Sequence, residues 1–146
     1  MRTILYIGVH CTATASNVPV QNITDYWKNK KGWKYPGYHY IIKANGQIIQ
    51  LLDEKRIANG VKGFNDESIH IGYIGGKDKN GKSTDTRTKA QEQAMFDKLV
   101  ELSEKYPEAT IQGHRDFDNP KKKTCPNFDV ADWLSNYVPD IEHFCQ

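Results

Sequence analysis

The dipeptide Asn45-Gly46 is the feature that most restricts how this chain can fold. It lies between two runs, Gly37 to Lys43 and Gln47 to Leu52, in which apolar and polar side chains alternate. Asn-Gly is a preferred two-residue turn between antiparallel strands, and alternation with a period of two is typical of strands. The sequence therefore predicts a β-hairpin, and the fold must contain a sheet that includes it.

Further strands and helices are expected on both sides of this hairpin. β-branched, aromatic or other apolar runs predict three more strands: Thr3 to Val9, which ends at His10-Cys11; Ser68 to Ile74, which is closed by Gly75-Gly76; and Ala109 to Gln112. Pro19 can open a helix with Ile23, Tyr26 and Trp27 on one face, ending before Gly32. Thr88 and Gln91 form a capping box for a long amphipathic helix to about Lys105, and a last helix is expected from about Asp129 to Tyr137. The polar segment from Lys77 to Arg87 is predicted to be an exposed loop.

The size of the chain is that of one domain. Its 146 residues contain no internal repeat and no linker-like segment, so residues 1–146 are interpreted as a single domain. Because strands and helices intermix, the expected fold class is α/β, with a mixed central β-sheet flanked by helices.

Charge and localisation signals exclude several classes of function. The 20 basic and 18 acidic residues are mixed along the chain, so nucleic acid is not an expected partner; the dense basic pair Lys121-Lys122 is interpreted as part of a solvated loop. The apolar start of the chain is too short to span a membrane and lacks the cleavage pattern of a signal peptide. We expect synthesis in the cytoplasm, no membrane insertion and a monomer, with the three cysteines present as a ligand or as buried thiols.

Two histidines and one cysteine are candidate metal ligands. His10 and His114 follow predicted strands, and Cys125 lies in a loop after His114. Zinc binds imidazole nitrogen and thiolate sulfur, and a catalytic zinc site uses three protein ligands so that a fourth position stays open. The spacing alone is weak support, because five histidines and three cysteines offer many such triples.

Whole motifs around these residues resemble a known family. They are Val9-His10-Cys11-Thr12-Ala13-Thr14, Gly37-Tyr38-His39-Tyr40-Ile41-Ile42, Gly113-His114-Arg115-Asp116 and Lys123-Thr124-Cys125-Pro126. With these motifs in family order from about Leu5 to Leu134, the chain resembles the type 2 N-acetylmuramoyl-L-alanine amidases, the phage-lysozyme-like endolysins of the peptidoglycan-recognition-protein superfamily. The resemblance implies that His10, His114 and Cys125 bind one zinc ion and that Tyr38 and Lys123 act on the reacting carbonyl. It also implies the amidase fold and peptidoglycan as substrate.

Physical reasoning supports the two proposed catalytic side chains. In an extended loop Lys123 and Cys125 should face the same way, and the ammonium group would favour the thiolate. Lys123 is expected to stabilise the oxyanion of the tetrahedral intermediate. Tyr38 is expected to share a strand face with Tyr40 and Ile42, opposite His39 and Ile41, and a tyrosine of the core is its alternative interpretation. Tyr38 or Lys123 could deliver the proton to the leaving amine through a water.

Other conspicuous residues have ordinary interpretations or remain open. Cys11 is expected to point into the core, His39 to be a hydrogen-bonded structural histidine, and His143 and Cys145 to be uninvolved. Arg115 and Asp116 either orient His114 or form a salt bridge in a turn. The tryptophans at 27, 33 and 133 are interpreted as core or helix anchors, although Trp33 and Tyr35 could border the cleft. Two departures from the family pattern stand out: His70 where many relatives have glycine, and Asn59-Gly60-Val61 where a His-Ala pair is common.

Three hypotheses for function follow. The first is zinc-dependent hydrolysis of the bond between N-acetylmuramic acid and L-alanine, by an enzyme held in the cytoplasm until it reaches the cell wall or exported by a non-classical route. The second is a peptidoglycan-binding module without activity, for which loss of the cysteine ligand is the usual mark in this superfamily. The third is a purely structural zinc with function in a protein partner, and three ligands rather than four weigh against it.

Overall fold

A five-stranded mixed sheet forms the centre of the molecule, in the order β3-β2-β4-β1-β5. The computed structural model describes residues 2–117 and 123–139. Strand β1 (Tyr6–Cys11) lies between β4 (Ser68–Tyr73) and β5 (Thr110–Gly113) and is parallel to both. Strand β2 (Tyr40–Ile42) is parallel to β4, and β3 (Ile48–Gln50) is the antiparallel edge strand. The predicted mixed sheet is confirmed.

The predicted hairpin is β2 and β3. The turn is one residue longer than the predicted Asn45-Gly46 pair, because Lys43 N–H donates to the Gln47 carbonyl at 2.9 Å and leaves Ala44, Asn45 and Gly46 as the loop. Gly46 alone of these three has a positive φ, of 89°, and its N–H donates to the Lys43 carbonyl at 2.8 Å. The paired strands are shorter than the alternating runs, because pairing begins only at Tyr40 and ends at Gln50. Strand β1 is also displaced from its prediction: it starts at Tyr6 rather than Thr3, and it includes His10 and Cys11.

The predicted helices are all present. Helix α1 (Val20–Asp25) follows Pro19 and continues into the π-helical turn η1 (Tyr26–Lys30). On this segment Ile23 and Trp27 are buried as expected, but the prediction for Tyr26 is wrong, since its side chain is half exposed. Helix α3 (Val130–Asn136) is capped by the Asp129 side chain. None of the helices within the described residues is long and apolar enough to cross a membrane.

Helix α2 (Lys89–Lys105) matches its prediction closely. Thr88 and Gln91 form the capping box, with both hydrogen bonds present. Gln91 is buried, and its amide also donates to the carbonyls of Ile42 and Ile74, so the helix start is tied to the end of β2 and to the residue that follows β4. The loop before the helix is exposed as expected up to Asp85, whereas Arg87 packs its guanidinium on the Phe128 ring at 3.4 Å.

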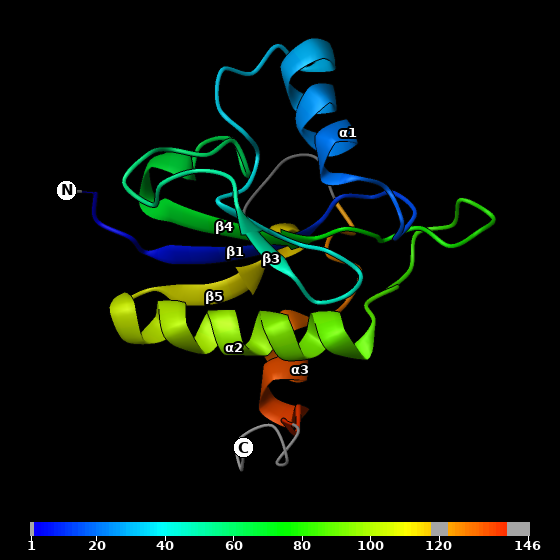
Figure 1. Cartoon of the computed structure of the whole chain (residues 1–146). Coiled ribbons are helices and arrows are strands. Elements are labelled where there is room, and N and C mark those ends of the chain that lie inside the picture. Colours follow the sequence, from blue (N-terminus) through cyan, green and yellow to red (C-terminus); the bar gives the residue numbers. More distant parts are fainter. Residues whose placement is uncertain (1, 118–122, 140–146) are drawn as a thin grey trace.

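The two faces of the sheet differ in what they bury. Figure 1 shows α2 along one face and α1 on the opposite side. Strand residues that point toward α2 form the main core with it, and they include Ile7, Val9, Cys11, Tyr40, Ile42, Ile69, Ile71 and Tyr73. The intervening positions of β1 and β4 point the other way, and there the chain places Gly8, His10, His70 and Gly72. The face toward α2 is thus apolar, whereas the other side carries the polar residues of β1 and β4 beside a second apolar cluster that includes Ile23, Trp27, Ile41 and Ile74.

A half-buried carboxylate ties the end of α2 to the hairpin. Glu54 accepts hydrogen bonds from the Tyr40 and Tyr106 hydroxyls, and its carboxylate lies 3.0 Å from the Lys105 ammonium. Burial opposes ionisation of Glu54, but the hydrogen bonds from Tyr106, Tyr40 and Lys105 outweigh it and lower the pKa of the carboxyl below 4.5.

We expect Glu54→Gln to destabilise the fold by about 1–3 kcal/mol, because an amide can accept fewer of these hydrogen bonds than a carboxylate. The pKa of Glu54 is lower in the folded than in the unfolded state. Ionised Glu54 therefore adds to the free energy of unfolding above about pH 4.5, and this contribution is lost as the pH falls through the folded-state pKa. Urea unfolding at pH 7 and pH 3.5 measures the loss of stability in the variant and its dependence on pH. The exposed Glu108→Gln serves as control, and equal stability of the two variants at pH 7 would contradict the assignment.

Candidate functional site

His10 and His114 lie at the carboxyl ends of neighbouring parallel strands. His10 is the second-last residue of β1, and His114 directly follows β5 in the short 3₁₀ turn η3 (His114–Asp116). Val9 pairs with Gly113, so the register places the two histidines side by side. Their Nδ1 atoms are 3.2 Å apart. The structure thus brings these two candidate ligands together at the carboxyl ends of β1 and β5.

Cys125 reaches the same place from the loop before α3. Its carbonyl accepts a hydrogen bond from Arg115 N–H at 2.9 Å, and its Sγ accepts one from Cys11 N–H at 3.1 Å. One donor atom each from His10, His114 and Cys125 lies within 4.8 Å of the others, and the three form a possible metal site. Two imidazole nitrogens and one sulfur are a donor set that suits zinc.

The protonation of the two histidines fits a metal site. Burial, followed by the neighbouring His70 and His114, lowers the pKa of His10 well below its ordinary value. Burial and then the charge of Lys123 lower the pKa of His114 to about 4. Both imidazoles are therefore neutral at pH 7, the form in which histidine binds a metal.

The expectation for Cys125 needs a correction. Hydrogen bonding with Cys11 and burial raise the pKa of the Cys125 thiol, so the metal-free chain holds it protonated. Lys123 acts in the expected direction but is outweighed. An ion that binds here must displace the thiol proton, which couples metal binding to pH.

Lys123 lies at the rim of this group. Its side chain is exposed, and its charge acts on both His114 and Cys125. An exposed ammonium whose charge reaches two of the donor residues can approach a bound substrate without having been desolvated beforehand.

Tyr38 stands beside His10, but not on the predicted face. It packs with Ile41 and Trp27, away from Tyr40 and Ile42, because strand pairing begins only at Tyr40 and the alternation does not extend back to Tyr38. Its ring stacks on His10 with centroids 5.0 Å apart, and its hydroxyl donates to the Cys11 carbonyl at 2.8 Å. Burial raises the pKa of Tyr38, so the hydroxyl keeps its proton.

Most residues with ordinary interpretations behave as expected. Cys11 is buried in the main core, and His39 is a buried structural histidine whose Nδ1 accepts from His70 N–H at 3.0 Å. Asp116 accepts from Gly113 N–H at 2.9 Å and so shapes the turn that carries His114. The predictions for Lys121, Lys122, His143 and Cys145 fall outside the described residues.

Reasoning from the sequence left the role of His70 open. Its Nδ1 lies 2.8 Å from Nε2 of His10, and its Nε2 lies 2.9 Å from the Asn65 Oδ1. Its position two residues before Gly72 on a buried strand, together with its departure from the family pattern, was the available signal.

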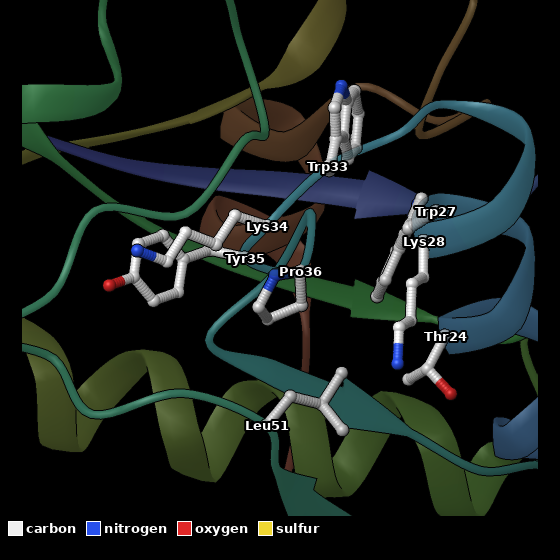
Figure 2. Close-up of a pocket in the computed structure, with 8 residues that line it drawn as sticks. All are labelled: Thr24, Trp27, Lys28, Trp33, Lys34, Tyr35, Pro36 and Leu51. Atoms are coloured by element: carbon white, nitrogen blue, oxygen red, sulfur yellow. The ribbon is translucent and has the colours of Figure 1, made fainter.

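A groove of about 200 Å³ lies on the same side of the sheet as α1. Figure 2 shows the side chains around it: Thr24, Trp27 and Lys28 from the helical segment, Trp33, Lys34, Tyr35 and Pro36 from the loop before β2, and Leu51 after β3. Trp27 also packs edge-on against Tyr38, with ring centroids 4.9 Å apart, and Tyr38 in turn stacks on His10. The groove is thus linked to the metal-ligand cluster through two aromatic rings. Trp33 and Tyr35 both line this groove.

Comparison with known proteins agrees with this arrangement. The family model for N-acetylmuramoyl-L-alanine amidase matches residues 1–128. The endolysin of Escherichia phage T7 is 38% identical over 129 residues, which cover 87% of this chain and 83% of the relative. Among solved structures, the Ph2119 endolysin from a Thermus scotoductus bacteriophage superposes with a TM-score of 0.79 at 23% identity, covering 96% of this chain and 88% of that one.

The fold is also shared with a recognition protein. Apis mellifera PGRP-SA has a TM-score of 0.72 at 19% identity, with 94% of this chain and 84% of that chain covered. From the family match over most of its length and its identity to phage endolysins, the chain belongs to the type 2 N-acetylmuramoyl-L-alanine amidase family.

Proposed function

We propose that this chain is a zinc-dependent amidase that hydrolyses the bond between N-acetylmuramic acid and L-alanine in peptidoglycan. The observation that carries the proposal is the cluster of His10, His114 and Cys125, whose donor atoms lie within 4.8 Å of one another in a chain of the amidase family. Retention of Cys125 beside Tyr38 and Lys123 favours an enzyme over a binding module without activity.

Zinc would be held by His10, His114 and Cys125, and when bound it would activate water and polarise the substrate carbonyl. The donor cluster within the described residues has three members. This number favours a catalytic role over a structural one, because structural zinc sites usually have four protein ligands.

Lys123 is the side chain that we assign to the developing oxyanion. Its exposed ammonium stands near His114 and Cys125, as its effect on their pKa values indicates. A cation would be useful in this site because the Cys125 thiolate would neutralise part of the charge of a bound zinc ion and make that ion a weaker electrophile. Preorganised charge at this place stabilises the transition state more than the ground state.

We assign Tyr38 to hydrogen bonding at the reacting carbonyl, to which its hydroxyl would donate in place of the Cys11 carbonyl. Its hydroxyl keeps its proton, and its ring is fixed against His10. Tyr38→Phe keeps that stacking and removes only the hydroxyl. We expect lower turnover at unchanged zinc content, whereas unchanged turnover would make Tyr38 a tyrosine of the core.

The groove of Figure 2 is the part of the surface that we assign to the glycan and stem peptide. The faces of Trp33 and Tyr35 suit sugar rings, and the ammonium groups of Lys28 and Lys34 suit carboxylates of the peptide.

Digestion of purified sacculi tests the proposed reaction. Mass analysis should detect released stem peptides with a free N-terminal alanine, together with glycan strands whose lactyl groups carry no peptide. A chelator should abolish the release, and added zinc should restore it. Release of disaccharide fragments, or hydrolysis that persists after the metal has been removed, would contradict the proposal.

A further inference from the structure

We propose that His70 is a positioning residue that holds the metal ligand His10 in one tautomer, with Nε2 protonated and Nδ1 free for the ion. The inference rests on the zinc site proposed above and adds a residue outside its ligand set. It starts from the two nitrogens of His10: Nδ1 faces His114 at 3.2 Å, and Nε2 faces His70 Nδ1 at 2.8 Å.

The hydrogen bonds around His70 allow one assignment of protons. The Asn65 Oδ1 accepts from Val61 N–H at 2.8 Å, and because a backbone N–H can only donate, this bond fixes the orientation of the amide. The same oxygen lies 2.9 Å from His70 Nε2, which must therefore carry a proton. Neutral His70 then has a bare Nδ1, and His10 Nε2–H donates to it.

This assignment leaves the lone pair of His10 Nδ1 on the side of His114 and Cys125. Both imidazoles are buried, with exposures of 1% for His10 and 0% for His70, so bulk water does not compete for these bonds. A hydrogen bond to the outer nitrogen of a histidine ligand fixes the orientation of its ring and makes the other nitrogen a better donor. The hydrogen bonds that link Asn65 to His70 and His70 to His10 therefore fix the ring of His10 and make its Nδ1 a better metal ligand.

The surrounding backbone makes room for this imidazole. A Cβ at Gly8, the residue opposite His70 on β1, would lie 2.7 Å from His70 Nδ1, and a Cβ at Gly60 would lie 2.4 Å from His70 Cγ. Neither glycine has the positive φ that would by itself favour glycine. Space for the His70 ring therefore explains both glycines. The two departures from the family pattern, at His70 and at Asn59-Gly60-Val61, meet at this contact.

A pair of substitutions separates hydrogen bonding from space filling. Asparagine carries an acceptor oxygen on Cγ, where histidine carries Nδ1, so His70→Asn can still accept from His10. Leucine also branches at Cγ but carries no hydrogen-bond acceptor, so His70→Leu cannot accept from His10. Zinc affinity is measured by competition with a chromophoric chelator at neutral pH. We expect His70→Leu to bind zinc about 10–100-fold more weakly than the unmodified chain and His70→Asn to recover most of that loss.

Two results would overturn the role of His70: unchanged affinity in the leucine variant, or equal losses in both variants. An unmodified chain that binds no zinc would instead refute the proposed metal site. Two-bond ¹H–¹⁵N correlation spectra of the unmodified, metal-free chain give a test that needs no variant to fold. They should show the Nε2–H tautomer for both His10 and His70, and a proton on Nδ1 of His10 would overturn the proposal.

Discussion

Cys125→Ser should lose stoichiometric zinc and with it the hydrolysis of peptidoglycan. A serine hydroxyl does not ionise near neutral pH, so the site would keep only the imidazoles of His10 and His114. Loss of the metal removes several kcal/mol of transition-state stabilisation, which corresponds to a fall in turnover on the order of 10³-fold or more. Zinc content by elemental analysis and peptide release from sacculi measure the two effects.

The neighbouring cysteine offers a matched control. Cys11 belongs to the main core and contacts the Cys125 thiol, but it is not one of the three donor residues, so Cys11→Ala should keep its zinc and most of its activity. The Cys125→Ser variant should still bind sacculi, since the groove of Figure 2 is unchanged, and it would then behave as a binding module. Full zinc content and full turnover in Cys125→Ser would contradict the assignment of the ligands.

Lys123→Ala should lower turnover by about 100-fold while zinc content stays the same. The ammonium is assigned to the oxyanion and not to the metal, so its loss weakens stabilisation of the transition state and leaves the ligands intact. The charge of Lys123 also contributes to the low pKa of His114, about 4. Because removal of a positive charge favours protonation, the pKa of His114 in the metal-free variant should rise, which NMR titration can measure.

A second exposed lysine controls for net charge. Lys89, at the start of α2, can be changed to alanine with the same loss of charge, and Lys89→Ala should keep normal turnover. Normal turnover in Lys123→Ala at full zinc content would remove Lys123 from the mechanism. Loss of zinc from that variant would make its role structural instead.

Local patterns predicted the elements that depend on local chemistry. The hairpin at Asn45-Gly46 and the capping box of Thr88 and Gln91 are confirmed because each is determined by a few neighbouring residues. His10 and His114 were recognised as candidate ligands because each follows a predicted strand, and the parallel pairing of β1 with β5 places them side by side. The inclusion of Cys125 came from the family resemblance, since loop spacing alone does not place a side chain.

What the sequence did not predict depends on contacts between distant segments. Tyr38 was assigned to the wrong face because nothing local shows that strand pairing starts two residues later. The pKa of Cys125 is raised by its contact with Cys11, which is 114 positions away. The contact of His70 with His10 likewise depends on the register of β1 and β4, whereas its other partner, Asn65, lies only five residues before it.

The central claim is that His10, His114 and Cys125 bind one zinc ion and leave a position for substrate. A crystal structure of the zinc-loaded chain, with anomalous data on both sides of the zinc absorption edge, tests it most directly. We predict a single peak of anomalous density bonded to Nδ1 of His10, an imidazole nitrogen of His114 and Sγ of Cys125, with no fourth protein ligand. Zinc at another place, or a fourth side chain that closes the coordination sphere, would contradict the account.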